Sequence, residues 1–115
     1  MRLRRPEDFR TVWSAGRSWA HPWFILWALP NESNRVRVGI TAGRKVGNAV
    51  ARNRARRLLR EAARHLYGSM VTGWDLVLVA RASIVNVQAP QVESALRHVL
   101  GLAGLWVSSP DDNDS

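Results

Sequence analysis

Hydrophobic positions first repeat at helical spacing directly after Pro6. Phe9, Val12 and Trp13 recur at i, i+3 and i+4, so they share one face of a helix. Proline suits the first helical position, and the two acidic residues that follow it favour the positive end of a helix. The pattern predicts a short helix over residues 6–15, which Gly16 ends.

Two further stretches have the period of a β-strand. Residues 21–30 are aromatic and apolar between prolines, and alternate residues from Trp23 to Leu29 point to one side while Phe24, Leu26 and Ala28 point to the other. Turn residues follow at 31–34, and residues 35–40 then alternate cleanly. We expect these two strands to pair as a hairpin. A nearly continuous apolar run at 74–80 predicts a third, buried strand.

Residues 48–67 have a helical pattern with two unlike faces. Asn48 is a suitable N-cap, and Gly68 ends the helix. One stripe consists of small and aliphatic residues: Ala51, Ala55, Leu58, Leu59, Ala62 and Leu66. The opposite arc is polar and mostly basic: Asn53, Arg54, Arg56, Arg57, Arg60 and Arg64, with Arg52 near its edge. A last helix opens at Pro90, with Val92, Leu96, Val99, Leu100 and Ala103 on its core face.

The order of elements is therefore α-β-β-α-β-α. It predicts an α+β fold, a two-layer sandwich with helices on one side of a mainly antiparallel sheet. Residues 1–107 form one domain of ordinary size. Residues 108–115 contain three acidic residues and are expected to be a flexible, solvated tail.

Charge points to a polyanionic partner. The 115-residue chain has a net charge of +8 and a pI of about 11.7. Residues 44–64 hold eight of the 17 basic residues and a single acid, Glu61. Nucleic acid is the first candidate and an anionic membrane the second. Almost all of the basic residues are arginine, whose planar fork binds phosphate in a bidentate way and stacks on bases.

Other classes of function are disfavoured. The absence of cysteine excludes disulfides and thiolate metal sites. No apolar leader opens the chain, and no apolar run is long enough to span a bilayer, so we expect a cytoplasmic protein. A metal-dependent nuclease needs clustered carboxylates, whereas the acidic residues here are scattered. Three histidines, His21, His65 and His98, lack metal-ligand spacing.

The arginine cluster allows three interpretations. It is a solvated basic face, a membrane-surface or calmodulin-type helix, or a surface that binds nucleic acid. A solvated basic face normally has acidic residues placed among the basic ones, whereas here the single acid Glu61 has six basic neighbours. The alanine-rich stripe suits close packing on a sheet better than insertion into lipid. Asn53 could contact a base edge, a 2′-hydroxyl or a metal-bound water.

The segment GNAVARNRARRLLRE, residues 47–61, resembles the signature of the protein subunit of bacterial ribonuclease P. The resemblance extends to RRPEDFRTVWSAGRS (4–18), WFILWALPN (23–31), RVGITAGRKVGNAV (37–50) and DLVLVAR (75–81). It therefore covers nearly the whole folded chain. It implies that the connection through the arginine helix is a left-handed βαβ crossover, an exception to the usual right hand.

The resemblance also implies which residues contact RNA. The RNR triplet stands here as Arg52, Asn53 and Arg54, and its basic continuation as Arg56, Arg57 and Arg60; Arg44 and Lys45 match the basic pair before it. Phe9, Trp13 and Trp27 match aromatic positions of a cleft that holds the 5′ leader of precursor tRNA. Trp13 and Trp27 replace the Phe or Tyr common in relatives, and Gly43 replaces a small hydroxyl residue. Trp19, Trp74 and Trp106 are expected in the core.

The function implied is that of a ribonucleoprotein subunit. In that family the RNA subunit removes the leader with magnesium-activated water, and the protein binds the RNA subunit and precursor tRNA. No catalytic residue and no metal ligand are then expected on this chain. We expect Arg54→Ala and Arg57→Ala to weaken RNA binding with little loss of stability. The alternative is an RNA-binding protein without enzymatic function, such as a ribosomal component.

Overall fold

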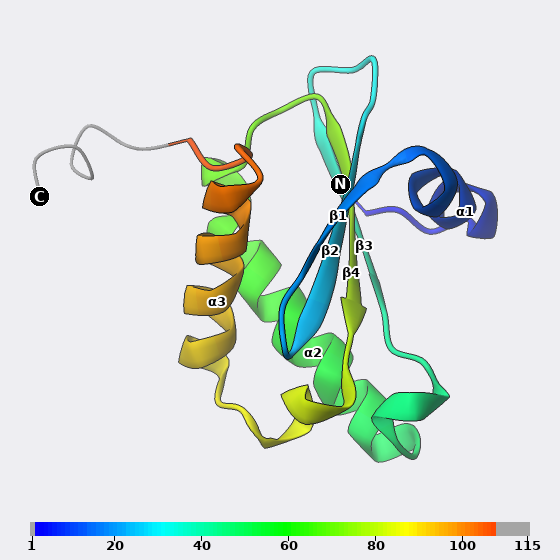
Figure 1. Ribbon diagram of the computed structural model, residues 1–115, viewed down its shortest axis with the longest axis vertical. Coiled ribbons are helices and arrows are strands. Elements are labelled where there is room, and N and C mark those ends of the chain that lie inside the picture. Colours follow the sequence, from blue (N-terminus) through cyan, green and yellow to red (C-terminus); the bar gives the residue numbers. More distant parts are fainter. Residues whose placement is uncertain (1, 108–115) are drawn as a thin grey trace, which may run out of the picture.

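The computed structural model of the chain describes residues 2–107 (Figure 1). The helices are α1 (Pro6–Ala15), α2 (Ala49–Leu66) and α3 (Ala89–Leu102), with short 3₁₀ turns η1 (Arg44–Val46), η2 (Tyr67–Ser69) and η3 (Ala82–Asn86) between elements. The strands are β1 (Arg17–Ala20), β2 (Phe24–Pro30), β3 (Val36–Thr41) and β4 (Trp74–Ala80). All three predicted helices and all three predicted strands are confirmed. The predicted acidic tail at 108–115 lies outside the described residues.

One strand, β1, was not predicted. It is only four residues long, three of them exposed, so its sequence shows no apolar alternation. It pairs antiparallel with β2, and the turn between them contains His21 and Pro22, which were expected to belong to the following strand.

The predicted hairpin is wrong. The strand order is β1-β2-β4-β3, so β4 lies between the two strands that were expected to pair. β4 is antiparallel to β2 and parallel to β3. The physical reason is burial: β4 is buried on both faces and takes the centre of the sheet, whereas β3 carries the charged Arg37 and is more exposed, which suits an edge. The sheet is mainly antiparallel, as predicted.

The parallel pair is connected through the arginine-rich helix. β3 leads through η1 into α2, and the chain returns along β4. In Figure 1 both strands run downward, β1 is nearest the viewer so that β3 lies behind β4, and α2 runs from below the strands up to their left, on the side of α3. This arrangement is the left-handed crossover that the resemblance implied.

Alternate residues of the sheet serve two separate clusters. Leu76 and Leu78 join the large core beneath α2 and α3, together with Phe24 and Leu26 of β2. Val77 points the other way, toward α1, where it packs with a smaller cluster. Figure 1 shows α1 on the opposite side of the sheet from α2 and α3. The two-layer prediction therefore holds for α2 and α3, whereas α1 covers part of the second face.

Asp75 of β4 accepts hydrogen bonds from two other segments on the α1 side of the sheet. It is the one buried charged residue in the described part of the chain, with 6% of its surface exposed. Arg37 of β3 binds it in a bidentate way, with Nε 2.8 Å from Oδ1 and Nη2 2.6 Å from Oδ2. Asn31, in the loop after β2, donates to Oδ1 at 2.7 Å. The hydrogen bond to Asp75 raises the pKa of Arg37.

We predict that Asp75→Ala lowers the free energy of unfolding by about 2–4 kcal/mol, because Arg37 and Asn31 lose their hydrogen-bond acceptor next to a buried site. Urea denaturation measures the change. Glu32→Ala, at an exposed loop position, removes the same charge and should change stability by less than about 0.5 kcal/mol. Equal effects of the two substitutions would show that net charge matters rather than this network.

Candidate nucleic-acid interface

A turn that requires glycine comes directly before α2. η1 carries Arg44 and Lys45, both exposed, and ends at Gly47, whose φ is 139°. L-residues rarely adopt this conformation, so glycine is needed to turn the chain here. Asn48 then caps the helix by accepting a hydrogen bond from the amide of Ala51 at 2.9 Å. The basic pair of η1 and the first turn of α2 are thereby held in a fixed relation.

The buried stripe of α2 fixes which arginines face outward. Ala55, Leu58, Leu59, Ala62, Ala63 and Leu66 are all buried. This matches the predicted stripe, except that Ala63 is added and Ala51 is half-buried. Because the stripe packs on the sheet and α3, the side chains directly opposite it face solvent.

The outward row of α2 consists of Asn53, Arg57, Arg60 and Arg64, which are all exposed. Arg52 and Arg56 are half-buried, and Arg56 donates to the Oδ1 atom of Asn53. The amide of Asn53 is thus engaged by its own helix. Within residues 2–107 no carboxylate forms a salt bridge with Arg57 or Arg60, so their positive charge is available to an anion.

Only one acid lies within the basic row. Glu61 accepts a hydrogen bond from Nη2 of Arg64 at 2.8 Å. This bond lowers the pKa of Glu61 and raises that of Arg64. The pair is exposed, so it offsets little of the repulsion among the arginines.

Arg54 has a different environment from its neighbours. Its Nε donates to the carbonyl of Val85 at 3.0 Å and its Nη2 to the carbonyl of Val87 at 3.3 Å. Val85 lies in η3 and Val87 follows it directly, so Arg54 fastens α2 to the segment that leads into α3. The expectation that Arg54 faces outward with little structural role is wrong. On the helix it lies on the flank toward α3, where His65 also approaches Glu93, with Nδ1 3.2 Å from Oε1.

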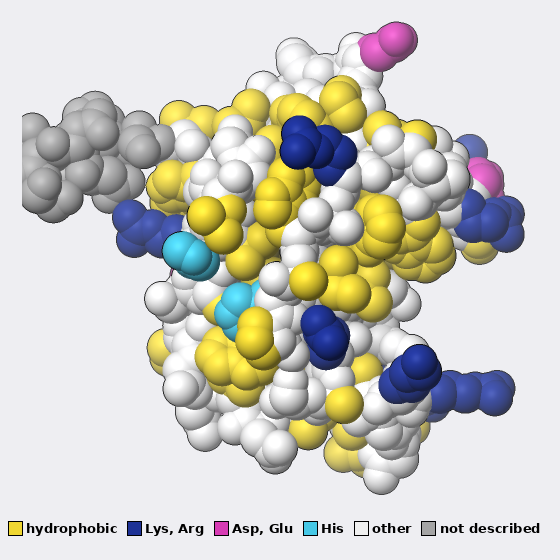
Figure 2. Space-filling view, in the orientation of Figure 1, with side chains coloured by type: hydrophobic (Ala, Val, Ile, Leu, Met, Phe, Trp, Pro, Cys, Tyr) yellow, Lys and Arg dark blue, Asp and Glu magenta, His cyan; other side chains and the backbone are white. Residues whose placement is uncertain are grey.

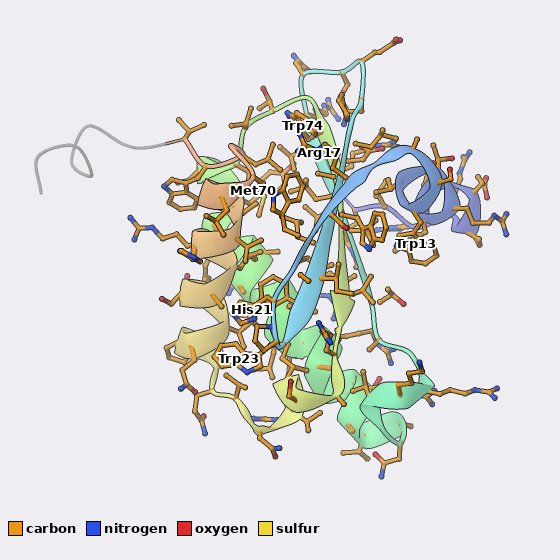
Figure 3. All side chains as sticks on the ribbon, viewed as in Figure 1. Trp13, Arg17, His21, Trp23, Met70 and Trp74 are labelled. Carbon is orange, nitrogen blue, oxygen red and sulfur yellow. The ribbon has the colours of Figure 1, made fainter. Side chains whose placement is uncertain are left out.

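The three aromatic residues of the predicted cleft lie together on the α1 side of the sheet. Phe9 and Trp27 pack on the small cluster formed by Leu3, Val12 and Val77. The ring centroids of Phe9 and Trp13 are 5.8 Å apart, with the ring planes tilted by 55°. Figure 2 shows hydrophobic side chains gathered where α1 meets the sheet, and Figure 3 places Trp13 there.

The three aromatics are not equally accessible. A Cβ built on Gly39 would lie 2.7 Å from the Phe9 ring, so this ring rests directly on the backbone of β3. Phe9 therefore anchors α1 to the sheet. Trp13 is 39% exposed and Trp27 is half-buried, so these two present ring surface to solvent.

The other aromatic and histidine residues do not join this surface. Trp19, Trp74 and Trp106 are partly buried against the large core, as predicted. His21 stacks on Phe24 with centroids 4.9 Å apart, and burial together with nearby His98 lowers the pKa of His21. Across residues 2–107, no three acidic or histidine side chains gather as metal ligands would. Nor does a helix in this part of the chain have the length and hydropathy to cross a bilayer.

Two basic residues close to the predicted RNA contacts of α2 were not assigned to the site from sequence. Arg64 extends the row one turn beyond Arg60, a spacing that could have identified it. Arg2 pairs with Val38 at the free edge of β3, and the amide of Leu3 donates to the Val38 carbonyl at 2.9 Å. No sequence signal places the chain start at this edge, because the pairing is non-local.

Comparison with known proteins finds the family that the sequence resembles. Residues 1–104 match the family described as Ribonuclease P. A "Ribonuclease P protein component" from Herpetosiphon aurantiacus is 42% identical over 105 residues, covering 91% of this chain and 85% of that protein.

Solved structures are similar throughout the fold. The RNase P protein of Staphylococcus aureus superposes with a TM-score of 0.81 at 29% identity, covering 91% of this chain and 96% of that one. That of Thermotoga maritima superposes with a TM-score of 0.78 at 30% identity, covering 87% and 94%.

We predict that Arg54→Ala lowers the free energy of unfolding by about 1–3 kcal/mol, because two charge-assisted hydrogen bonds to carbonyls are lost. Arg57→Ala, three residues along, should change it by less than about 0.5 kcal/mol. Urea titration of both variants checks this difference. Indistinguishable midpoints would mean that the contact with η3 does not stabilise the fold.

Proposed function

The chain belongs to the ribonuclease P protein family, and on that premise we propose that it is the protein subunit of a ribonuclease P ribonucleoprotein. It binds the catalytic RNA subunit through α2 and η1, and the 5′ leader of precursor tRNA on the α1 side of the sheet. The RNA subunit then removes the leader to give the mature 5′ end. One observation carries this proposal: the segment that resembles the family's signature exposes Arg57 and Arg60 on one side of α2, while the opposite side of the helix packs into the core.

The chemistry of the α2 surface fits an RNA backbone. Arg57 and Arg60 extend from a rigid helix, with Arg44 and Lys45 beside its start. Guanidinium groups match the geometry of phosphate oxygens, and a helix holds them at a regular spacing. Arg52 lies at the end of the first turn, where the positive end of the helix dipole adds to the attraction for phosphate, and Asn53 follows it.

Magnesium is assigned to the RNA rather than to this chain. The described residues form no cluster of carboxylates or histidines that fits a magnesium ion, which prefers oxygen ligands. The proposed contribution of this chain is to bind and position RNA, and the catalytic groups are those of the RNA subunit.

The surface beside α1 suits a single strand of variable sequence. Trp13 and Trp27 offer ring faces, and stacking accepts any base because every base has a π-face. Phe9 holds α1 in place and so fixes the width of this surface. Leaders differ between tRNAs, so a site that stacks rather than reads base edges fits the task.

Reconstitution tests the proposed function. The purified protein is combined with the ribonuclease P RNA of its own source, and cleavage of precursor tRNA is followed at a magnesium concentration at which that RNA alone is inactive. Restored cleavage at the mature 5′ end is the expected result. A protein that binds this RNA and others equally, without restoring cleavage, would be a general RNA-binding protein such as a ribosomal component.

We predict that binding to the RNA subunit falls steeply with salt. If α2 and η1 meet about four or five phosphates, the affinity drops by about 0.7–0.9 log units per log unit of salt for each phosphate. Arg57→Ala should make this slope shallower by about 0.7–0.9, the contribution of one phosphate. Filter binding at several salt concentrations measures both slopes, and salt-insensitive binding would refute the electrostatic account.

We predict that Trp13→Ala weakens holoenzyme binding of precursor tRNA about 5- to 100-fold, with little effect on mature tRNA, because only the precursor has a leader to stack. The measured quantity is the ratio of the two affinities. Trp106→Ala serves as a control, since Trp106 packs under Arg97 with a guanidinium-to-centroid distance of 5.1 Å, on the α3 side. An unchanged ratio in a folded Trp13→Ala holoenzyme would remove Trp13 from the leader site.

A further inference from the structure

A hollow opens between the free edge of β3 and the second half of α2. Its volume is about 420 Å³, which is within the range of sites for small organic ligands. Val38 and Ile40 of β3 form one wall, and Ala63 with Tyr67 forms the other. The predicted RNA contacts include only one residue of its lining, Arg60.

The rim of this hollow is basic. Arg60 and Arg64 border it from α2, and Arg2 borders it from the segment that pairs with β3. No carboxylate lines it, although Glu61 binds Arg64 from outside. The hollow therefore combines an apolar interior with three guanidinium groups at its mouth.

The walls are held in place. The Tyr67 hydroxyl donates to the carbonyl of Val36 at the edge of β3, so the ring cannot swing freely into the space. Leu3 donates its amide to Val38 and fixes the segment that carries Arg2. A site with fixed walls loses less entropy on binding than a flexible one.

We propose that this hollow captures one unstacked nucleotide of the ribonuclease P RNA subunit. The base enters between Tyr67 and the side chains of β3, and the flanking phosphates pair with Arg60 and Arg64. Proteins commonly bind bases that are splayed out of an RNA fold by stacking and apolar contact, and arginine is the usual partner for the adjoining phosphates.

Two features favour this occupant over a protein segment. Three guanidinium groups without an acid in the lining are complementary to a polyanion. The hollow also continues the outward row of α2, in which Arg57 precedes Arg60, so RNA lying along that row passes over its mouth. The inference rests on the proposed binding of the RNA subunit to α2.

Ala63→Phe tests the proposal, because it fills the hollow with a ring and leaves every arginine in place. We expect the affinity for the RNA subunit to fall about 5- to 100-fold, by the same factor at every salt concentration, since the phosphate contacts are unchanged. Ala15→Phe adds the same ring at an exposed position on α1 and should leave the affinity unchanged. Circular dichroism and melting of both variants establish that they are folded.

A second measurement needs no variant. The wild-type complex with unmodified RNA subunit is irradiated with short-wavelength ultraviolet light, and the RNA-linked peptides are identified by mass spectrometry. An adduct on Tyr67 is the expected result. Adducts elsewhere on α2 without one on Tyr67, or an Ala63→Phe variant that folds and binds normally, would overturn the proposal. If the wild-type protein does not bind the RNA subunit at all, the proposed function itself fails.

Discussion

The structure depends on the burial of β4 from both faces. Because side chains alternate along a strand, Leu76 and Leu78 must serve the core beneath α2 and α3, while Asp75 and Val77 serve the α1 side. This places two surfaces of different chemistry on opposite sides of one sheet. The basic row of α2 faces away from one side, and the aromatic surface beside α1 lies on the other.

The arginine row has a cost that the core must offset. Basic residues one turn apart repel, and the exposed pair of Arg64 with Glu61 relieves little of this. The helix keeps its position because six aliphatic residues on its other face are buried and because Arg54 fastens it to η3. The guanidinium group of Arg54 thus binds carbonyl groups within the protein, whereas those of Arg57 and Arg60 are exposed to solvent. Within the RNR triplet, Arg54 therefore has a structural role.

Most of the secondary structure could be predicted from sequence because helix stripes and strand alternation are local signals. The pairing of strands could not: the turn at 31–34 resembles that of a hairpin, and only the two-sided burial of β4 shows that β3 is displaced to the edge. The position of Arg54 was missed for a similar reason, since the carbonyls that it contacts are more than 30 residues away. The grouping of Phe9, Trp13 and Trp27 was anticipated from the family resemblance, whereas the support of Phe9 by Gly39 became visible only in three dimensions.

We propose that the basic row of α2 and the aromatic surface beside α1 bind their RNA partners independently across the sheet. A double-mutant cycle with Arg57→Ala and Trp13→Ala tests it most directly, with the readout being the total free energy of assembling the protein, the RNA subunit and precursor tRNA. Independent binding predicts that the two effects add to within about 0.5 kcal/mol, as expected for distant sites without shared partners. A coupling energy above about 1 kcal/mol would contradict it, because it would mean that one RNA element spans both surfaces or that the sheet transmits a change between them.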